Sequence, residues 1–396
     1  MPNRKIAEKI LESANNVNRV SGLTHNFYRY PARFSPVFAA TAINLLSKPG
    51  DFVLDPYMGG GTTIVEALAA GRHAIGTDLN SLAVFITKVK TTPLNKSDKE
   101  AVICWHESFP SKLSYRFPQN ELQYLLNDNK TRNLHLPKAR FIKKLIAVAI
   151  NSIEILPSLR SRNFVRCAIL KTGQWALDGR KSHVSLKDFR IRLSQNIIQM
   201  LNEINEFSNV INQHRKIRPK NTLVETDAAL LHKSPIFSKK KIKASLVVTS
   251  PPYPGVHVLY HRWQVDGRKE TPAPYWIAGC NDGQAYSYYN FGGRREKGLT
   301  SYFENSLRTL QTIRSVMHDG GYIVQMIAFS DPTKHLPLYL SNMQKSGFKE
   351  VQLNINVGKI PRISRIWRCV PNRRWHATLQ GNTTCSNEVV LIHVAY

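Results

Sequence analysis

One short segment of the chain combines a hydroxyl, two prolines and an aromatic ring: Thr249-Ser250-Pro251-Pro252-Tyr253. Consecutive prolines fix φ and lack N–H donors, so the backbone presents carbonyl acceptors in a rigid geometry. An exocyclic amino group has two hydrogens to donate. The Ser250 hydroxyl and the Pro251 carbonyl could accept both while Tyr253 stacks on the ring. This arrangement exposes the nitrogen lone pair, so attack on a methyl group needs orientation more than a strong base. The alternative is a proline turn that closes a buried strand.

A second segment is a glycine-rich turn over residues 55–63, with the sequence Asp-Pro-Tyr-Met-Gly-Gly-Gly-Thr-Thr. Its glycines, from Gly59 to Gly61, permit positive φ angles and close approach of a ligand to the backbone. A phosphate-binding P-loop would place a lysine before Thr62, and the absence of that lysine disfavours ATP. The turn alone is a weak signal, because glycines follow strands in many nucleotide-binding and purely structural turns.

Two acids at the ends of predicted strands make this turn more specific. Asp78 follows the apolar run 73–77 and lies 23 positions after Asp55 (78 − 55), a spacing at which a carboxylate meets ribose hydroxyls. Asp227 follows the run 222–226 and could accept a hydrogen bond from an adenine amino group. We therefore predict a nucleoside ligand that carries an amino-acid tail. A solvated acid at a strand end is the alternative for both residues.

The elements that position these residues follow from apolar periodicity. The run 51–54 predicts a strand, residues 64–70 a helix that ends at Gly71, and residues 73–77 a second strand, which together form a βαβ unit. Later strands are predicted over 222–226, 245–248, 322–327, 351–355 and 389–394, with helices over 300–317 and 336–345. The pattern predicts an α/β fold with a doubly wound, Rossmann-like sheet.

The middle of the chain has a different texture, with long amphipathic stretches over 140–155 and 186–207 and little strand character. We divide the chain into a cofactor-binding part over 1–96, a helical insertion over 97–220 and a catalytic part over 221–396, in which residues 254–298 look irregular. The insertion either recognises the target or lies beside the element that does. Its charge is near the chain average and does not single it out.

Composition points to a polyanionic partner. The chain has 396 residues, and 55 Lys and Arg against 27 Asp and Glu give a net charge of +28, which favours nucleic acid through phosphate contacts. A basic surface attracted to acidic membranes is the alternative. No apolar run is long enough for a membrane helix, and the N-terminus lacks a signal core, so a cytoplasmic location is expected. The five cysteines lack CxxC spacing, so neither a metal site nor a disulfide framework is expected.

The two motifs and their order resemble the S-adenosylmethionine-dependent amino-methyltransferases of DNA, with Met58 and Gly60 as departures from the family pattern. The segment 25–36 is similar to the family segment that folds over the methionine end of the cofactor. The resemblance implies a class I methyltransferase fold and S-adenosyl-L-methionine as cofactor. The cofactor-binding residues that it implies are Tyr30, Phe34, Asp55, Pro56, Tyr57, Gly59, Gly61, Thr62, Thr63, Asp78, Leu79, Asn80 and Asp227.

The Ser-Pro-Pro-Tyr form of the catalytic motif, Ser250, Pro251, Pro252 and Tyr253, resembles the cytosine-N4 branch, whereas adenine-N6 enzymes mostly carry Asp or Asn in place of Ser250. The resemblance implies methylation of a flipped-out cytosine in double-stranded DNA. Its setting would be a prokaryotic restriction-modification system, at the nucleoid, with a cognate endonuclease that acts separately. Cytosine-C5 chemistry is disfavoured, because no cysteine follows a proline. Adenine-N6 methylation, RNA or protein methylation and a non-catalytic DNA-binding protein remain alternatives.

Two basic and aromatic stretches are candidates for the DNA contacts. One lies beside the catalytic motif and the other between residues 351 and 387, where no acid occurs. Aromatic packing within a loop is the alternative for the first, and a solvated basic edge for the second. The predicted DNA-binding residues are Arg262, Trp263, Arg294, Arg295, Lys359, Arg362, Arg365, Arg368, Arg373 and Arg374.

Overall fold

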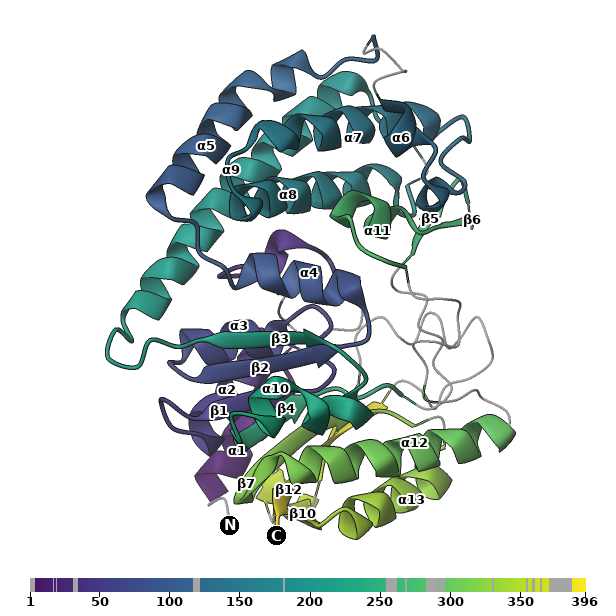
Figure 1. The fold of residues 1–396 in the computed structure, drawn as a ribbon. Helices are drawn as coiled ribbons and strands as arrows, with labels where there is room; N and C mark the ends of the chain where they lie inside the picture. Colours follow the sequence, from purple (N-terminus) through teal and green to yellow (C-terminus); the bar gives the residue numbers. More distant parts are fainter. Residues whose placement is uncertain are drawn as a thin grey trace.

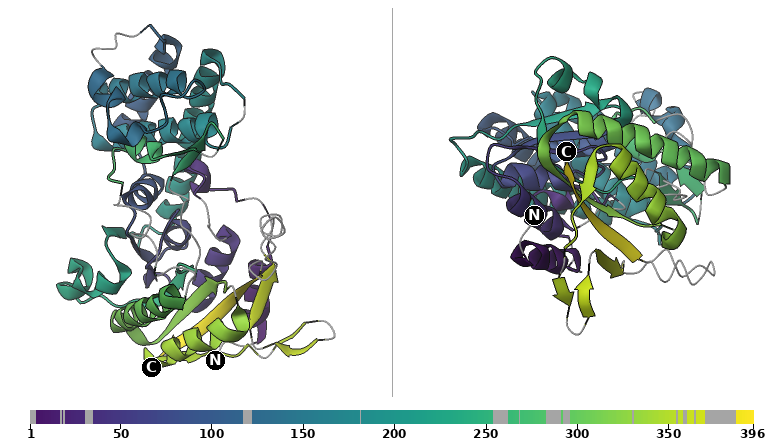
Figure 2. Two further views of the ribbon diagram at one scale, coloured as in Figure 1. Left: turned by 90° about the vertical axis from the view of Figure 1, so that its right-hand side faces the viewer. Right: turned by 90° about the horizontal axis from the view of Figure 1, so that it is seen from below.

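The chain folds into a sheet part and a helical part that lie one above the other (Figure 1), so that the molecule is elongated (Figure 2). Both termini lie in the sheet part. The structure is a computed structural model that describes residues 4–16, 18, 20–30, 35–116, 122–180, 182–253, 262–267, 269–282, 291, 296–329, 331–353, 355–357, 360–363, 365–369 and 387–396.

The sheet part contains eight strands in the order β11-β12-β7-β4-β1-β2-β3, with β8 paired to β12. The strands are β1 Phe52–Asp55, β2 His73–Asp78, β3 Asn221–Glu225, β4 Ala244–Thr249, β7 Met317–Ile327, β8 Phe348–Glu350, β11 Ile366–Cys369 and β12 Asn387–Ala395. Strands β3, β2, β1, β4 and β7 are parallel, and β12 is antiparallel to its neighbours. This order, with one antiparallel strand inserted near the edge, is that of the class I methyltransferase sheet, and it confirms the predicted fold class.

Alternating residues of each strand enter two different cores, as the period of a strand requires. Val53 and Val248 face the core on the side of the N-terminal helices, whereas Leu54 and Val247 face the core formed with α12 and α13. The N-terminal helices are α1 Arg4–Ala14, α2 Pro36–Leu46, α3 Thr62–Ala69 and α4 Ser81–Lys90, and the opposite helices are α10 Pro235–Ser238, α12 Glu296–Ser315 and α13 Pro332–Lys345. The sheet is therefore covered on both faces, which explains why its parallel strands are almost uniformly apolar.

The helical part is built mainly from the predicted insertion. Its helices are α5 Lys96–Ser108, α6 Gln123–Leu126, α7 Arg140–Ser152, α8 Leu159–Leu177 and α9 Leu186–Asn212. Two of these match the predicted amphipathic stretches, whereas α8 is not among the helices that we predict individually. Gly173 lies on the buried face of α8 and leaves room for the Trp263 ring, because a Cβ at this position would lie 3.1 Å from that ring.

A segment that follows the catalytic motif also packs on the helical part. Strands β5 Trp263–Val265 and β6 Lys269–Thr271 form a hairpin, and α11 Ala273–Ala278 follows it. Arg166 of α8 donates to the Ile277 carbonyl at 3.2 Å, and the Gly179 N–H donates to the Gln264 carbonyl at 2.8 Å. The expectation that residues 254–298 are irregular is therefore wrong for residues 263–278.

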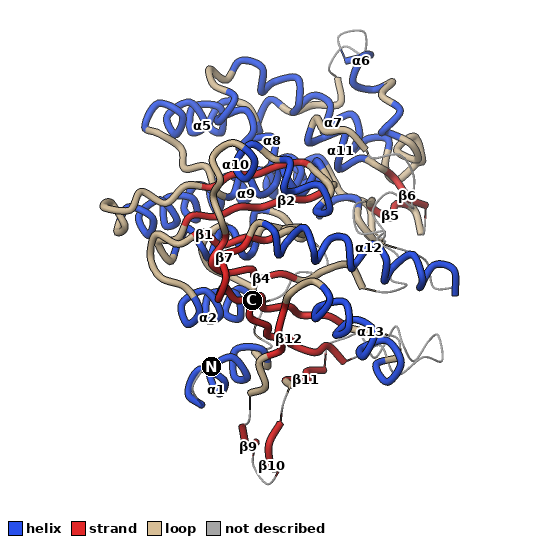
Figure 3. Tube along the Cα trace, turned by 60° about the horizontal axis from the view of Figure 1, so that its bottom comes forward, coloured by secondary structure: helices blue, strands red, loops and turns tan. Residues whose placement is uncertain are grey.

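Three smaller features complete the fold. The hairpin of β9 Ile355–Val357 and β10 Ile360–Ile363 projects away from the sheet (Figure 3). The strand predicted over 351–355 overlaps β9 only at Ile355, because β8 ends at Glu350. Gly347, with φ of +83°, ends α13 and lets β8 begin one residue later. Within the described ranges, no helix is both long and apolar enough to cross a membrane.

Candidate active site

The two motifs meet at the carboxyl ends of adjacent parallel strands. Asp55 ends β1 and Thr249 ends β4, and these strands are neighbours in the sheet. The Thr249 hydroxyl donates a 2.6 Å hydrogen bond to Oδ1 of the Asp55 carboxylate, which joins residues 194 positions apart. The Thr63 hydroxyl, just after the glycine turn, donates to the Val248 carbonyl at 3.0 Å. The fold therefore connects the glycine turn directly to the proline motif.

The conformation of the turn requires glycine at position 61. Gly61 has φ of +74°, and a Cβ there would lie 2.5 Å from the Thr87 hydroxyl oxygen. The Gly59 N–H donates to Oδ2 of Asp78 at 2.9 Å, and the Asn80 N–H donates to Oδ1 of the same carboxylate at 2.9 Å. Asp78 thus holds the turn and the start of α4 together, and each of its oxygens retains a further lone pair for a ligand.

Tyr30 covers the turn. The Tyr30 side chain is 7% exposed, and a Cβ at Gly60 would lie 2.9 Å from its Cβ. Its hydroxyl accepts a hydrogen bond from the Asn80 amide at 3.3 Å. Tyr30, predicted to cover the methionine end of the cofactor, therefore lies over the predicted cofactor turn, whereas Phe34 lies outside the described residues.

Both acids of the turn have raised pKa values. Burial raises the pKa of Asp55 to about 6, although hydrogen bonds from Thr249, Thr63 and the Tyr57 N–H oppose this shift. Burial likewise raises the pKa of Asp78 to about 6 against the opposing hydrogen bonds of its backbone donors. A ligand hydroxyl would stabilise the ionised form of Asp78, because only that form offers all its oxygens as acceptors.

The catalytic motif is held by hydrogen bonds that fix its donors and acceptors. The Ser250 hydroxyl donates to the Met326 carbonyl at 3.0 Å. Because a carbonyl can only accept and a hydroxyl has one proton, this bond leaves the lone pairs of Ser250 available as acceptors. The Pro252 carbonyl accepts from the Tyr302 hydroxyl at 3.0 Å. The Tyr253 hydroxyl oxygen lies 3.2 Å from that of Ser250 and donates to Glu388 at 2.7 Å.

Glu388 is a residue of this site that the sequence analysis does not single out. Its side chain is buried, and its second oxygen accepts from Nε of Arg368 at 2.9 Å. Arg368 also donates to the Ala14 carbonyl at 3.0 Å. One sequence signal could have indicated Glu388: it is the first acid after a long stretch without any, and it directly precedes the apolar run of β12.

The other predicted cofactor residues lie around the same strand ends. The Pro56 carbonyl accepts from the Thr77 hydroxyl at 3.0 Å, and the Tyr57 ring contacts Phe291 edge to face at 5.7 Å. Thr62 begins α3 and is buried, and Leu79 lies between Asp78 and Asn80. Asp227 follows β3, caps the 3-10 helix η6 Ala228–Lys233 through the Ala229 N–H at 2.9 Å, and lies 3.7 Å from the Arg308 guanidinium.

Several of the predicted DNA-binding residues are buried or form ion pairs within the protein. Trp263 is buried, and its indole N–H donates to the Tyr28 hydroxyl at 2.9 Å, so its ring packs in the core instead of facing DNA. Arg262 pairs with Asp282 at 2.8 Å. Arg365 forms two hydrogen bonds to Glu350, at 2.5 and 2.7 Å, while Arg368 is paired with Glu388. These ion pairs neutralise three arginines that we predict as phosphate ligands. Arg294, Arg295, Lys359, Arg373 and Arg374 lie outside the described residues, as does the side chain of Arg362 on β10.

Comparison with known proteins finds a family match over the first part of the chain. Residues 3–89 match the family model described as DNA methylase. This match relates the chain to the amino-methyltransferases of DNA and supports S-adenosyl-L-methionine as its cofactor. The matched range contains Tyr30, the glycine turn and Asp78, which are the residues that we predict to hold that cofactor.

Curated relatives agree with this assignment. Type II methyltransferase M.MvaI of Kocuria varians is 34% identical over 140 residues, which cover 33% of this chain and 29% of that protein. Type II methyltransferase M.MthZI of Methanothermobacter thermautotrophicus is 28% identical over 127 residues, which cover 31% of this chain and 36% of that protein. The matched part of the chain thus spans about a third of the length of each of these relatives.

Solved structures also resemble the chain. TrmN from Thermus thermophilus is 10% identical with a TM-score of 0.32, and the alignment covers 92% of this chain and 49% of that one. The rRNA methyltransferase aviRa from Streptomyces viridochromogenes is 11% identical with a TM-score of 0.32, and the alignment covers 94% and 90% of the two chains. The fold assignment itself rests on the strand order given above.

The residues at the strand ends suit a nucleoside cofactor. Within the described part of the chain, no group of three or more His, Cys, Asp and Glu side chains could hold a metal ion. The acids at the strand ends lie singly, and Asp78, which accepts from the Gly59 N–H of the turn, retains lone pairs that could accept from the hydroxyls of a ribose.

Proposed function

We propose that this chain is a site-specific DNA methyltransferase that transfers a methyl group from S-adenosyl-L-methionine to the N4 amino group of a cytosine. The observation that carries the proposal is the bond between Thr249 and Asp55, which places Ser250 beside the family's cofactor turn. The second support is the hydrogen bond from Ser250 to Met326, since it makes the serine an acceptor for an amino group.

The cofactor, when bound, would supply an electrophilic methyl group. Asp78 would accept from its ribose hydroxyls, Asp227 from its adenine amino group, and Tyr30 would cover its methionine end. The buried ends of β1 and β4, Asp55 and Thr249, would help to exclude water from a bound cofactor.

The target amino group would meet a site with acceptors only. Ser250 would accept one of its hydrogens and the Pro251 carbonyl the other. The neighbouring Pro252 carbonyl accepts from the Tyr302 hydroxyl. Tyr253 would stack on the pyrimidine ring, with its hydroxyl held by Glu388. Two such hydrogen bonds would orient the amino nitrogen and its lone pair, and orientation of this kind can supply several kcal/mol of a rate enhancement.

The substrate that we propose is double-stranded DNA. The net charge of +28 favours binding to phosphates, and a base in a duplex must leave the stack to reach Ser250. Flipping costs a few kcal/mol, which backbone contacts and stacking on Tyr253 would offset. A restriction-modification setting, with an endonuclease that acts separately, is part of this proposal.

Nucleoside mass spectrometry tests the proposal. DNA is incubated with the protein and cofactor, digested to nucleosides and analysed for methylated bases. We expect N4-methylcytosine. Its absence, under conditions where the protein binds cofactor and DNA, would contradict the cytosine assignment. N6-methyladenine would assign the adenine alternative, methyl groups in RNA or protein would assign another substrate class, and DNA binding without turnover would indicate a non-catalytic protein.

A further inference from the structure

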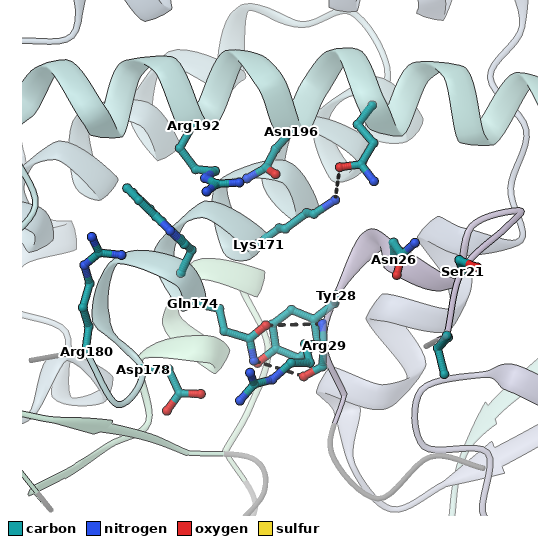
Figure 4. Close-up of a pocket in the computed structure, with 13 residues that line it drawn as sticks. Ser21, Asn26, Tyr28, Arg29, Lys171, Gln174, Asp178, Arg180, Arg192 and Asn196 are labelled. Atoms are coloured by element: carbon teal, nitrogen blue, oxygen red, sulfur yellow. Dashed lines mark hydrogen bonds between the residues drawn. The ribbon is translucent and has the colours of Figure 1, made fainter. Parts of the chain in front are cut away.

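A second candidate binding site lies in the helical part. A hollow of about 760 Å³ opens between α8, the first half of α9 and residues 20–29 (Figure 4). It is separate from the strand ends that carry Ser250 and Asp78. None of the DNA-binding residues predicted from the sequence lines it.

The hollow concentrates positive charge. Arg29, Lys171, Arg180 and Arg192 line it with a single acid, Asp178, which gives a local charge of +3 (4 − 1). Lys171 donates to the Gln199 side chain at 3.1 Å. Within the described part of the chain, none of the three arginines forms an ion pair, unlike Arg262, Arg365 and Arg368. A lining of this kind fits an anion, because Asp178 alone offsets the charges of the cations that line the hollow.

Two of these cations, Arg180 and Arg192, form cation–π contacts with the ring of Trp175. The guanidinium carbon of Arg180 lies 4.4 Å from the ring centroid of Trp175, and that of Arg192 lies 4.8 Å from it. The buried Nε of Arg180 has no hydrogen-bond partner among the described residues. Cation–π contact leaves the N–H groups of a guanidinium free to point at an anion, and it reduces the rotamer freedom lost on binding. The guanidinium groups of Arg180 and Arg192 are therefore preorganised for binding phosphate.

The hollow adjoins the cofactor site through a shared segment. The Gln174 side chain clamps the backbone of Arg29, accepting from its N–H at 3.3 Å and donating to its carbonyl at 3.0 Å (Figure 4). The next residue, Tyr30, lies on the glycine turn. A ligand in the hollow thus contacts the segment that covers the predicted cofactor turn.

We propose that this hollow binds phosphates of the DNA backbone, with Arg180 and Arg192 as their principal ligands. The assignment of the polyanion to DNA rests on the proposed function. The hollow gives the helical part a role in holding the substrate, which its average charge did not indicate. Charge is concentrated there because residues from positions 29, 171, 180 and 192 converge in the fold.

The salt dependence of DNA binding tests this inference. The logarithm of the affinity falls with the logarithm of the salt concentration by about 0.9 for each phosphate contact. We expect the double variant R180Q/R192Q to bind duplex DNA at least tenfold more weakly at moderate salt, with a slope reduced by about 2. The variant R180K/R192K keeps both charges and should retain most of the slope.

A matched control removes the same charge elsewhere. Lys239 and Lys240 are exposed and precede β4, so they lie at the amino edge of the sheet, away from the strand ends. K239Q/K240Q should leave the slope near the wild-type value. Melting temperature and affinity for S-adenosylhomocysteine, measured for every variant, show whether a loss of DNA binding reflects unfolding.

The outcomes separate this inference from the proposed function. A folded R180Q/R192Q protein whose affinity and slope match K239Q/K240Q would overturn it, even where the wild type methylates DNA. Saturation of the hollow by inorganic phosphate, with unchanged DNA affinity in the variant, would show a small-anion site and would also overturn it. Weakened DNA binding in a protein that methylates no DNA would support the phosphate site while the proposed function fails.

Discussion

The Tyr253 hydroxyl donates a 2.7 Å hydrogen bond to the Glu388 carboxylate, although the two residues are 135 positions apart. Glu388 lies in β12, two strands away from the β4 strand that leads into the catalytic motif. Its other oxygen is bound by Arg368, so the carboxylate is held on both sides. The ring that we expect to stack on the target base is therefore fixed by the antiparallel edge of the sheet.

Replacement of Glu388 by Gln should slow methyl transfer without weakening cofactor binding. A hydrogen bond to a charged group contributes about 1.5–3 kcal/mol, so loss of the carboxylate should lower kcat about tenfold to a hundredfold. Single-turnover methylation of DNA and titration with S-adenosylhomocysteine measure the two effects separately.

Glu350 provides the matched control for this experiment. It is also a glutamate that is paired with an arginine, here Arg365, which directly precedes β11, but its side-chain hydrogen bonds in the described part of the chain do not involve the motif. E350Q should retain the wild-type rate. Equal losses of rate in E350Q and E388Q would indicate a general effect of ion-pair loss and would contradict a positioning role for Glu388.

Substitutions of Ser250 and Asp78 should separate turnover from cofactor binding. Ser250→Ala removes the acceptor that we assign to the target amino group, so its rate should fall while cofactor affinity changes little. Asp78→Ala removes the bonds to Gly59 and Asn80 and should weaken cofactor binding first. Binding and turnover measurements on both variants check this, and the reverse pattern would show that the two sites have been exchanged.

Much of this site follows from the sequence because it lies where strands end. Apolar runs followed by polar residues predict the carboxyl ends of parallel strands, and the structure brings Asp55, Asp78 and Thr249 to one edge. The βαβ unit is local in sequence, so periodicity and Gly71 suffice to predict it. The hydrogen bond between Thr249 and Asp55 forms because β1 and β4, whose ends carry these residues, are neighbours in the sheet.

The remaining features depend on contacts that no local pattern encodes. Trp263 has the residue type of a DNA-stacking side chain, yet it fills the space beside Gly173 and is buried. Arg365 looks free in a stretch without acids, but its partner Glu350 precedes that stretch. In both cases, the partner of the side chain lies in another element of the fold, which composition alone does not indicate.

Gly61→Ala should destabilise the fold by several kcal/mol and abolish cofactor binding. Alanine at φ of +74° is strained by about 1–2 kcal/mol, and its Cβ would lie 2.5 Å from the Thr87 hydroxyl oxygen. Gly179 is the matched control, because its φ is +65° and a Cβ there would meet nothing within 4 Å. Urea unfolding of both variants separates strain from crowding, and equal losses of stability would contradict the crowding at the turn.

Cofactor affinity should fall as the pH drops through about 6. Burial raises the pKa of Asp78 from its ordinary value of 3.8 to about 6, so its carboxyl group is ionised above that pH and protonated below it. The ionised form accepts ribose hydroxyls, and protons therefore compete with the cofactor, with a loss approaching tenfold for each pH unit below 6. Calorimetric titration with S-adenosylhomocysteine between pH 5 and 8 measures this. Asp78→Asn should bind weakly at every pH with a flatter profile, whereas a full pH step in that variant would assign the titration to Asp55, whose pKa is also about 6.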